Sequence, residues 1–484
     1  MRSFFVKNIL FVIAVNILVK PIWVFLIDRN VQNCLPKGDY GTYQALLSLS
    51  IIFQTVLDFG ITNYNSRTIS QNPDKLATLF PAMLSARFAL ILIYMFLAFG
   101  LGWLIGYRGW ELNLLIGVLL IQSLNALVSF IRSNVSALHR FKTDGLLSIT
   151  DRLLMIIICG FLLLYPATAK NFKIEWFVIT QIVCYFISAV VGYLLLKRIS
   201  KVKLHFSIHL PTILKIIKDS FPYALLIFQM SIYNRADAMM IERMCVNGKE
   251  QADIWAAAFR LLDVANMFGL MFATILLPLF GRMLSQKQDV QPIVKLGVNM
   301  MLPVSIMIAI SGILFSGDIM HLLYKNKGHD CDKVFSFLIA SFPSWCLMYI
   351  YSTLLTANGN LKIMNVIAFA GVLINLSLNY YLINNFEALG GAVASLITQT
   401  TLALIFVGMA KKILKLPVNF KWLLAHFGYI ILMFILYYCI ANFGILGNIQ
   451  WMLKLLIFSI VSFGFIFLFR FISIKSVKQL FNKG

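Results

Sequence analysis

Residues 296–316 read LGVNMMLPVSIMIAISGILFS and contain no charged side chain. A helix of about 20 apolar residues crosses the hydrocarbon core of a bilayer, so this stretch predicts a membrane-spanning helix. Comparable stretches recur along the chain. Their continuous apolar character argues against a β-barrel, in which short strands alternate apolar and polar side chains.

We predict an all-α integral membrane protein with about fourteen spans. Six lie before residue 200, six more lie before residue 413, and two follow. The predicted spans are residues 8–27, 40–58, 83–106, 111–131, 151–166, 175–196, 221–244, 253–280, 296–316, 334–356, 363–383, 389–410, 422–441 and 451–469.

Composition supports this class. The 484 residues are 60% hydrophobic and 12% charged, whereas a soluble domain carries about 25% charged residues. A soluble enzyme, a nucleic-acid-binding module and a disordered regulator are therefore excluded. The formal net charge of +22 is a topology signal, because Lys and Arg stay on the cytoplasmic side of short loops. With both termini cytoplasmic, most of these residues lie inside.

Short matches at similar positions indicate an internal repeat. RTISQ at 67–71 corresponds to RMLSQ at 282–286, and KR at 197–198 corresponds to KK at 411–412. Such matches favour two parallel six-helix lobes around a central cavity, as in one class of transporter. The expected parts are an N-lobe (1–200), a basic cytoplasmic linker (201–218), a C-lobe (219–412), and two extra helices with a basic tail (413–484).

Motifs of catalysis are missing from the sequence. It has no Gly-rich ATPase loop, no HExxH and no paired-Cys metal motif. The longest predicted external loop, 317–333, is too short for a catalytic domain. We therefore expect no enzyme activity, no bound metal and no cofactor beyond a coupling proton or sodium ion.

Ionisable residues inside predicted spans are the candidate functional groups, since each costs about 2.5–3.5 kcal/mol on insertion scales and usually faces a cavity or a partner. Among Lys and Arg, we assign Lys20, Arg235, Arg260 and Lys454 to spans. Lys454 is interpreted as snorkelling to the interface. Asp58, just before Gly60, is interpreted as a helix-end turn residue rather than a proton carrier.

Two interpretations of the charged residues remain open. In one, they are salt bridges that hold helices together. In the other, Lys20, Arg235 and Arg260 bind an anionic headgroup such as a pyrophosphate, which suits the planar fork of arginine. Asp237 and Asp263 then pair with those cations or take part in ion coupling.

Helical spacing places some of these groups on common faces. Gln229, Tyr233 and Asp237 are four residues apart, so they predict a polar stripe with Arg235 on another side. Arg260 and Asp263 are three apart, and this spacing predicts a pair along one helix.

A set of short motifs, in order along nearly the whole chain, resembles a known family. These motifs are DYGTY at 39–43, LDFG at 57–60, DAMMI at 237–241, AAFR at 257–260, ANG at 357–359 and GGA at 390–392. They are similar to the polysaccharide-repeat (O-antigen) flippases of the multidrug, oligosaccharidyl-lipid and polysaccharide exporter superfamily. The sequence departs from that family at 253–255, where DIW replaces its Gly-x-Tyr.

The resemblance implies a flippase of the bacterial inner membrane, which moves an undecaprenyl-pyrophosphate-linked oligosaccharide across the bilayer by alternating access. It also implies membrane lipid, a polymerase and a chain-length regulator as partners. Two alternatives belong to the same superfamily: a drug or cation exporter, and a peptidoglycan-precursor flippase. A drug or cation exporter needs acidic residues in its cavity, whereas the first predicted span carries Lys20. A third rival is a membrane enzyme that joins sugars outside the cell.

Overall fold

The computed structural model describes residues 19, 21–138, 140–200, 210–324, 330–417, 420–442, 450–469 and 471. Within these ranges every regular element is a helix. The prediction of an all-α membrane protein is confirmed.

The helices up to residue 244 begin near the end of the first predicted span. In chain order they are η1 (Trp23–Asp28), α2 (Arg29–Cys34), α3 (Asp39–Phe53), η2 (Gln54–Leu57), α4 (Ile61–Gln71), η3 (Pro73–Lys75), α5 (Leu76–Ile105), α6 (Trp110–Ala137), α7 (Phe141–Leu164), α8 (Pro166–Ala169), α9 (Ile174–Ser200) and α10 (Leu210–Met244).

The remaining described helices follow a short turn after α10. They are α11 (Gly248–Ser285), α12 (Gln291–Leu314), α13 (Ser316–Leu323), α14 (Asp330–Ala340), α15 (Phe342–Ala357), α16 (Leu361–Leu414), α17 (Phe420–Asn442) and α19 (Trp451–Leu468).

Eleven of the fourteen predicted spans lie in helices that are long and apolar enough to cross a membrane, whereas α3 and α10, which hold the predicted spans 40–58 and 221–244, do not meet that criterion. Ten helical segments of the described residues are long and apolar enough to cross a membrane. One of them, α16, contains two predicted spans, because the backbone at Glu387 leaves the helical region (φ 51°, ψ −131°) and separates them. The first predicted span, 8–27, lies mostly outside the described residues.

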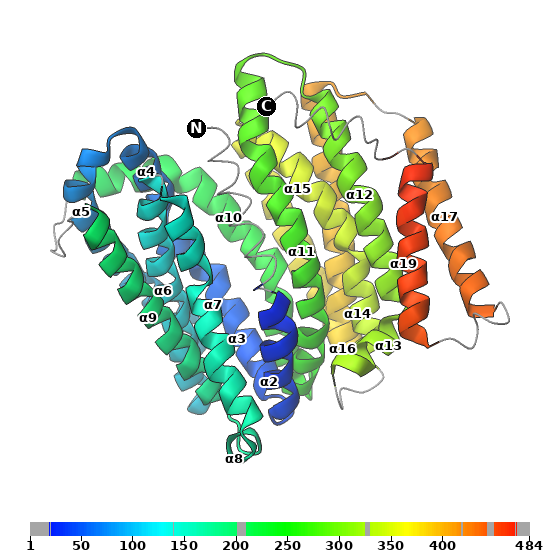
Figure 1. Ribbon diagram of the computed structural model, residues 1–484, viewed down its shortest axis with the longest axis horizontal. Helices are drawn as coiled ribbons and strands as arrows, with labels where there is room; N and C mark the ends of the chain where they lie inside the picture. The colour runs from blue at the N-terminus through cyan, green and yellow to red at the C-terminus, as the bar shows by residue number, and fades with distance from the viewer. Residues whose placement is uncertain are drawn as a thin grey trace. The chain divides into compact units, whose positions relative to one another are not determined.

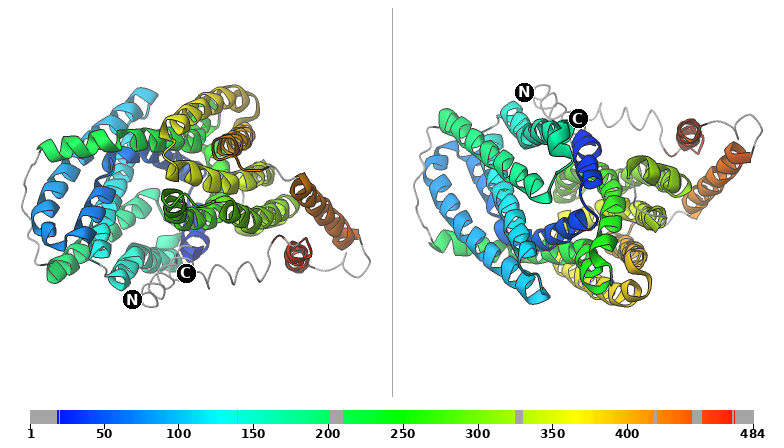
Figure 2. Two further views of the ribbon diagram at one scale, coloured as in Figure 1. Left: turned by 90° about the horizontal axis from the view of Figure 1, so that it is seen from above. Right: turned by 90° about the horizontal axis from the view of Figure 1, so that it is seen from below.

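The chain divides into two compact units, Met1–Asp253 and Ile254–Gly484. In the first unit, α6 packs along α9, and α3 packs along α10 (Figures 1 and 2). The unit therefore extends beyond the basic linker expected at 201–218, of which 201–209 lie outside the described residues and the rest begins α10. The predicted six-helix lobes and their boundaries stay predictions.

In the second unit, α12 and α16 make the main contacts. α12 packs against α14 and α15, and α15 packs against α16. The last two predicted spans, α17 and α19, pack against each other and against α12 (Figure 1).

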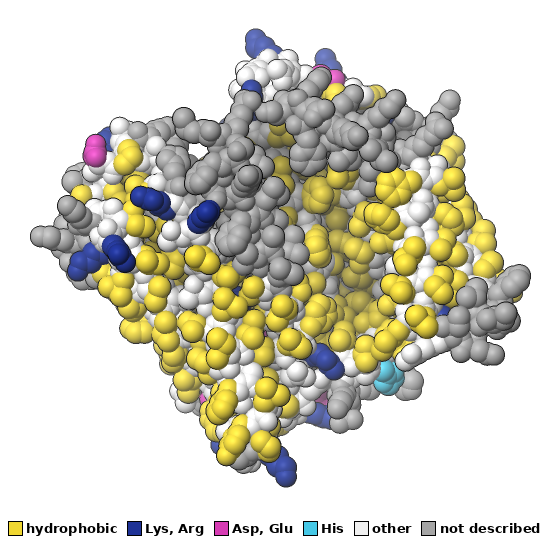
Figure 3. Space-filling view, in the orientation of Figure 1, with side chains coloured by type: hydrophobic (Ala, Val, Ile, Leu, Met, Phe, Trp, Pro, Cys, Tyr) yellow, Lys and Arg dark blue, Asp and Glu magenta, His cyan; other side chains and the backbone are white. Residues whose placement is uncertain are grey.

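Large apolar side chains are exposed on the outside of several helices. On α5, Leu92 and Phe96 are 71% and 77% exposed, and on α7, Ile157 and Phe161 are both 67% exposed. Figure 3 shows hydrophobic side chains covering much of one face. Soluble monomers rarely expose apolar surfaces this large, so these faces are suited to contact with lipid.

Candidate functional site

The predicted polar stripe on α10 is buried. Gln229, Tyr233 and Asp237 are at most 9% exposed, and Asp237 is fully buried. Arg235, between them in sequence, is half-buried. Since α10 packs along α3, the stripe belongs to the interior of the first unit.

The predicted pair on α11 is present but loose. The Nη1 atom of Arg260 lies 3.9 Å from Oδ2 of Asp263, and the two side chains are 17% and 21% exposed. A pair at this distance holds its cation weakly. Both charges keep some accessible surface.

The remaining predicted cation, Lys20, lies outside the described residues. Arg235 belongs to the first unit and Arg260 to the second. The roles of Lys20, Arg235, Arg260, Asp237 and Asp263 therefore stay predictions.

The assignment of Lys and Arg to spans was incomplete. Arg87 lies in the predicted span 83–106 and Arg152 in the predicted span 151–166, and the structure places both inside long apolar helices, α5 and α7. A single arginine in an apolar window is a visible signal. The helices of the first unit therefore carry more cations than predicted.

The turn between η2 and α4 positions Asp58, the ion-pair partner of Arg87. Phe59 and Gly60 have positive φ angles of 39° and 79°, a conformation that glycine adopts without strain. The carboxylate of Asp58 then accepts hydrogen bonds from the backbone N–H of Thr62, at 3.2 Å, and from its hydroxyl. Asp58 thus lies in the turn before α4 and binds its first turn, which agrees with its interpretation as a turn residue.

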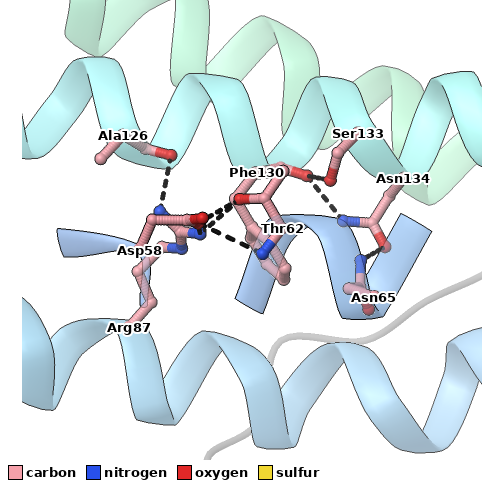
Figure 4. A network of polar contacts seen from close by, with 8 residues as sticks. All are labelled: Asp58, Thr62, Asn65, Arg87, Ala126, Phe130, Ser133 and Asn134. Carbon is pink, nitrogen blue, oxygen red and sulfur yellow. Dashed lines mark hydrogen bonds and ion pairs between the residues drawn. The ribbon is translucent and has the colours of Figure 1, made fainter. Parts of the chain in front are cut away.

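Arg87 joins this turn to α6 (Figure 4). Its side chain is 1% exposed and pairs with Asp58. It also donates to Thr62 Oγ1 at 2.7 Å and to the Ala126 carbonyl at 3.1 Å. The guanidinium lies over the Phe130 ring, 5.0 Å from its centroid. One buried cation therefore holds three segments together.

A second hydrogen-bond chain continues from the same place (Figure 4). Asn65 donates to Asn134 Oδ1 at 2.7 Å, and Asn134 donates to the Phe130 carbonyl at 2.7 Å. An apolar cluster that includes Phe80, Met83 and Phe130 surrounds the network. In such surroundings an unpaired charge is costly, so Asp58 and Arg87 require each other.

The opposite end of the first unit carries a four-charge cluster. Glu111, at the start of α6, accepts from Arg243 Nη2 at 2.7 Å and from Lys249 Nζ at 2.7 Å. Glu242 accepts from Arg243 Nε at 2.9 Å and from the Tyr107 hydroxyl at 3.1 Å. The cluster is electrically neutral and ties the α10–α11 turn to α6.

Asp253 anchors the start of α11 in the same unit. Its carboxylate accepts from the Gly38 backbone N–H at 3.1 Å, and Gln32 donates to its carbonyl at 3.0 Å. Gly41 allows the close approach, because a Cβ there would lie 2.2 Å from the Lys249 carbonyl oxygen. The DYG motif therefore packs against the first turns of α11, at 249–253.

Two groups at this end have shifted pKa values. Burial raises the pKa of Asp39, and the nearby carboxylates of Glu175 and Asp253 raise it further against the opposing effect of Lys249. Burial also raises the pKa of Tyr107, helped by Glu242. In both cases the surroundings disfavour the charged form.

The middle of the first unit contains a third group. Arg152 on α7 lies against Trp23 of η1 and Tyr185 of α9, and its Nε atom is 3.4 Å from Asp151. Asp28 accepts from the Tyr40 hydroxyl at 2.9 Å. Among the described residues, no group of three or more His, Cys, Asp or Glu is arranged to hold a metal ion.

These charged groups lie in a fold shared with known transporters. The lipid II flippase MurJ, in an inward closed conformation, superimposes with a TM-score of 0.71 at 17% identity, over 95% of this chain and 98% of that one. A MATE protein in complex with MaL6 gives 0.56 at 15% identity, over 84% and 94%.

A transporter of the same superfamily from Pyrococcus furiosus gives a TM-score of 0.57 at 14% identity, again over 84% of this chain and 94% of that one. At these identities the likeness concerns the fold. No curated protein matches the sequence.

The family itself follows from the sequence models. The model described as polysaccharide biosynthesis protein matches residues 5–284, more than half of the chain, and the MatE model matches residues 222–381. This agrees with the prediction of a membrane transporter of the exporter superfamily rather than an enzyme. The chain belongs to the polysaccharide biosynthesis protein family.

Proposed function

We propose that this protein is a flippase for a lipid-linked oligosaccharide. Its cargo is a polysaccharide repeat unit on undecaprenyl pyrophosphate, moved from the cytoplasmic to the external leaflet of a bacterial inner membrane. The observation that carries the proposal is the presence of cationic side chains within the apolar helices of a polysaccharide biosynthesis family member.

The depth of these cations suits a headgroup in transit. At 1.5 Å per residue, Arg235 lies about 14 Å from the end of α10 and Arg260 about 18 Å from the start of α11. If each helix end lies near a membrane surface, both positions are within a hydrocarbon core about 30 Å thick. A cation at that depth lowers the free energy of a pyrophosphate that has left the water.

Transport of this kind needs no covalent step. The polyprenyl tail stays in lipid while the sugar and pyrophosphate cross through the protein. Alternating access requires parts that rearrange, and the two compact units, linked in the chain through α11, are the candidates. Lys20, Arg235 and Arg260 would bind the headgroup, and Asp237 and Asp263 would pair with these cations or bind a coupling proton or sodium ion.

The positive-inside pattern supports cytoplasmic termini in this scheme. A polymerase and a chain-length regulator on the external side would consume the flipped repeat unit. The net positive charge of the proposed binding residues disfavours the cationic cargo of a drug exporter.

Mass spectrometry of polyprenyl-pyrophosphate saccharides tests the proposal in cells. Depleting the protein should make a complete lipid-linked repeat unit accumulate, while staining for the surface polysaccharide disappears. Accumulation of the peptidoglycan precursor instead would assign the rival flippase function. An unchanged lipid pool with an unchanged surface would reject a glycan cargo.

Point variants connect the phenotype to the proposed residues. Arg235→Ala and Arg260→Ala should block flipping while the protein stays abundant in the membrane. Lys333→Ala is a matched control, because Lys333 forms an equally short-range pair with Asp330 but is 60% exposed. Loss of the folded protein in both arginine variants would favour the salt-bridge interpretation.

A further inference from the structure

Two neighbouring helices of the first unit, α7 and α9, each combine a cationic end with an apolar outer face. Both contain candidate membrane spans, at Lys142–Leu164 and Ile174–Ser200. They pack against each other, and both pack against α6. The positions at which they meet decide which helix ends lie together.

α9 runs parallel to α6. A Cβ on Gly117 of α6 would lie 2.6 Å from Val178 of α9, and one on Gly192 of α9 would lie 3.1 Å from Ile131 of α6. The same Cβ on Gly192 would lie 3.8 Å from Leu147 of α7. The end of α6, the start of α7 and the end of α9 therefore lie at one end of the first unit.

This shared end is strongly cationic. Residues 132–144 and 196–200 contain five Lys or Arg residues and one acidic residue. The acidic residue, Asp144, already pairs with Arg132 at 2.8 Å. The other four cations are exposed and have no ion pair with another described residue: Arg140, Lys142, Lys197 and Arg198. We call these four residues the cationic patch.

On α7, the cationic patch continues into an exposed apolar stripe. Leu146 and Leu153 follow Lys142 at helical spacing and are 55% and 41% exposed. At 1.5 Å per residue, Leu153 lies about 17 Å from Lys142 along the helix. One leaflet of a hydrocarbon core about 30 Å thick has a similar depth, so the stripe matches the length of an acyl chain.

On α9, the same arrangement occurs beside the first. Leu194 and Ile187 precede Arg198 at helical spacing and are 56% and 37% exposed. Ile187 also lies about 17 Å from Arg198 along its helix. Figure 3 shows Lys and Arg side chains gathered at the end of the first unit that bears α4, next to a face of hydrophobic side chains.

We propose that this end of α7 and α9 binds an anionic phospholipid. The headgroup phosphate lies on the cationic patch, and the acyl chains lie along the apolar stripes of the two helices. Charge selects this occupant, because basic residues at the membrane surface attract anionic headgroups. The long stems of Lys and Arg also pack on apolar surface while their charged ends reach the headgroup. The site goes beyond the proposed function, since its ligand is a lipid of the membrane rather than the cargo.

Native mass spectrometry of the full-length protein in detergent tests this site. The protein is titrated with phosphatidylglycerol, or with phosphatidylcholine that carries the same acyl chains, and the bound lipids are counted. Wild-type protein should bind phosphatidylglycerol at least about tenfold more tightly. Equal affinities for the two lipids would overturn the proposal.

The double variant Lys142→Gln with Lys197→Gln removes one cation from each helix. It should weaken phosphatidylglycerol binding roughly 25-fold, because each cation near an anionic lipid contributes a factor of about five. Binding of phosphatidylcholine should not change. Unchanged binding of phosphatidylglycerol, or an equal loss for both lipids, would overturn the proposal.

The matched control is Lys170→Gln with Lys173→Gln. These two lysines are also exposed, but they lie between α8 and α9, at the opposite ends of the same two long helices. The control should leave the affinity for phosphatidylglycerol unchanged. If both double variants weaken it equally, the effect belongs to the overall charge of the protein and no site exists at the cationic patch.

Asp144→Asn changes the charge in the other direction. It removes the one carboxylate at this end and releases Arg132, so binding of phosphatidylglycerol should tighten about fivefold. Weaker binding would show that charge does not hold the lipid and would overturn the proposal.

Glycerol phosphate distinguishes a lipid site from a phosphate site. It carries the headgroup charge without acyl chains, so it should bind at least about a hundredfold more weakly than phosphatidylglycerol. Equal binding of the two would assign the cationic patch to a free phosphate and reject the lipid.

Discussion

The two units use charge differently. In the first unit, Arg87 pairs with Asp58 and Arg243 pairs with Glu111, so that ion pairs join residues far apart in the chain. In the second unit, Arg260–Asp263 and Lys333–Asp330 join residues three apart on one helix. Ion pairs therefore brace the tertiary structure of the first unit, whereas these two pairs of the second unit each lie within one helix.

Glycines at close helix contacts are a feature of the second unit as well. A Cβ at Gly269 would lie 2.6 Å from the Tyr349 ring, and one at Gly312 would lie 3.0 Å from Ile339. Asn379 donates to Asn375 Oδ1 at 3.0 Å along α16. Substitution of a charge should accordingly affect folding of the first unit more than that of the second.

The largest expected effect follows from Arg87→Ala. It leaves Asp58 without its buried partner and opens space beside Phe130, so we expect a loss of about 3–5 kcal/mol in unfolding free energy. Thermal unfolding of purified protein measures it. The double variant Asp58→Asn with Arg87→Met should recover much of the loss, and a double variant as unstable as Arg87→Ala would contradict the pairing argument.

Gly41→Ala should come next. The added Cβ would lie 2.2 Å from the Lys249 carbonyl oxygen, a backbone clash that we expect to cost about 1–3 kcal/mol. Gly408→Ala in α16 is the control, because no atom lies within 4 Å of its added Cβ. It should stabilise the helix by about 0.5–1 kcal/mol. Similar unfolding temperatures for the two variants would show that α3 and α11 do not pack so closely.

The variant Asp39→Asn tests the raised pKa of Asp39, the first residue of α3. The pKa of this carboxyl is higher in the folded protein than in the unfolded chain, where it is about 3.8. Its contribution to stability is therefore complete only below pH 3.8, and it is lost as the pH rises through the folded-state pKa. Asp39→Asn should therefore raise the unfolding temperature at pH 7 and have little effect at pH 3.5. A variant less stable at pH 7 than the wild type would contradict the shift.

The smallest stability effect should come from Asp263→Asn. Its pair with Arg260 spans 3.9 Å and both side chains are partly exposed, so we expect a change of less than about 1 kcal/mol. The same thermal unfolding measurement applies. A loss of unfolding free energy comparable to that caused by Arg87→Ala would show that ion pairs are equally important for the stability of both units.

Much of the fold follows from local pattern. Apolar runs such as 296–316 and 175–196 contain enough information to identify α12 and α9, because a helix crossing lipid satisfies its own backbone hydrogen bonds. Likewise, the four-residue spacing of Gln229, Tyr233 and Asp237 predicts that they share one face of a helix, and the structure shows that this face is buried.

The charge networks depend on tertiary structure, so local sequence patterns do not predict them. Glu111 and Arg243 are 132 residues apart in the chain, and nothing local in either segment identifies the other. Asp58 was correctly interpreted as a turn residue, but its pairing with Arg87 appears only when α5 packs against the turn. Arg152 shows the same limit, since Trp23 and Tyr185 come from two other helices.

Reconstitution into liposomes measures whether the protein itself moves the lipid-linked cargo between leaflets. Purified protein is inserted with a fluorescent undecaprenyl-pyrophosphate-linked repeat unit, and a membrane-impermeant quencher measures its transfer between leaflets. Wild-type protein should speed the transfer well above that of protein-free liposomes, and Arg260→Ala should abolish this gain without loss of reconstituted protein. Equal transfer rates with and without the wild-type protein would contradict the flippase function.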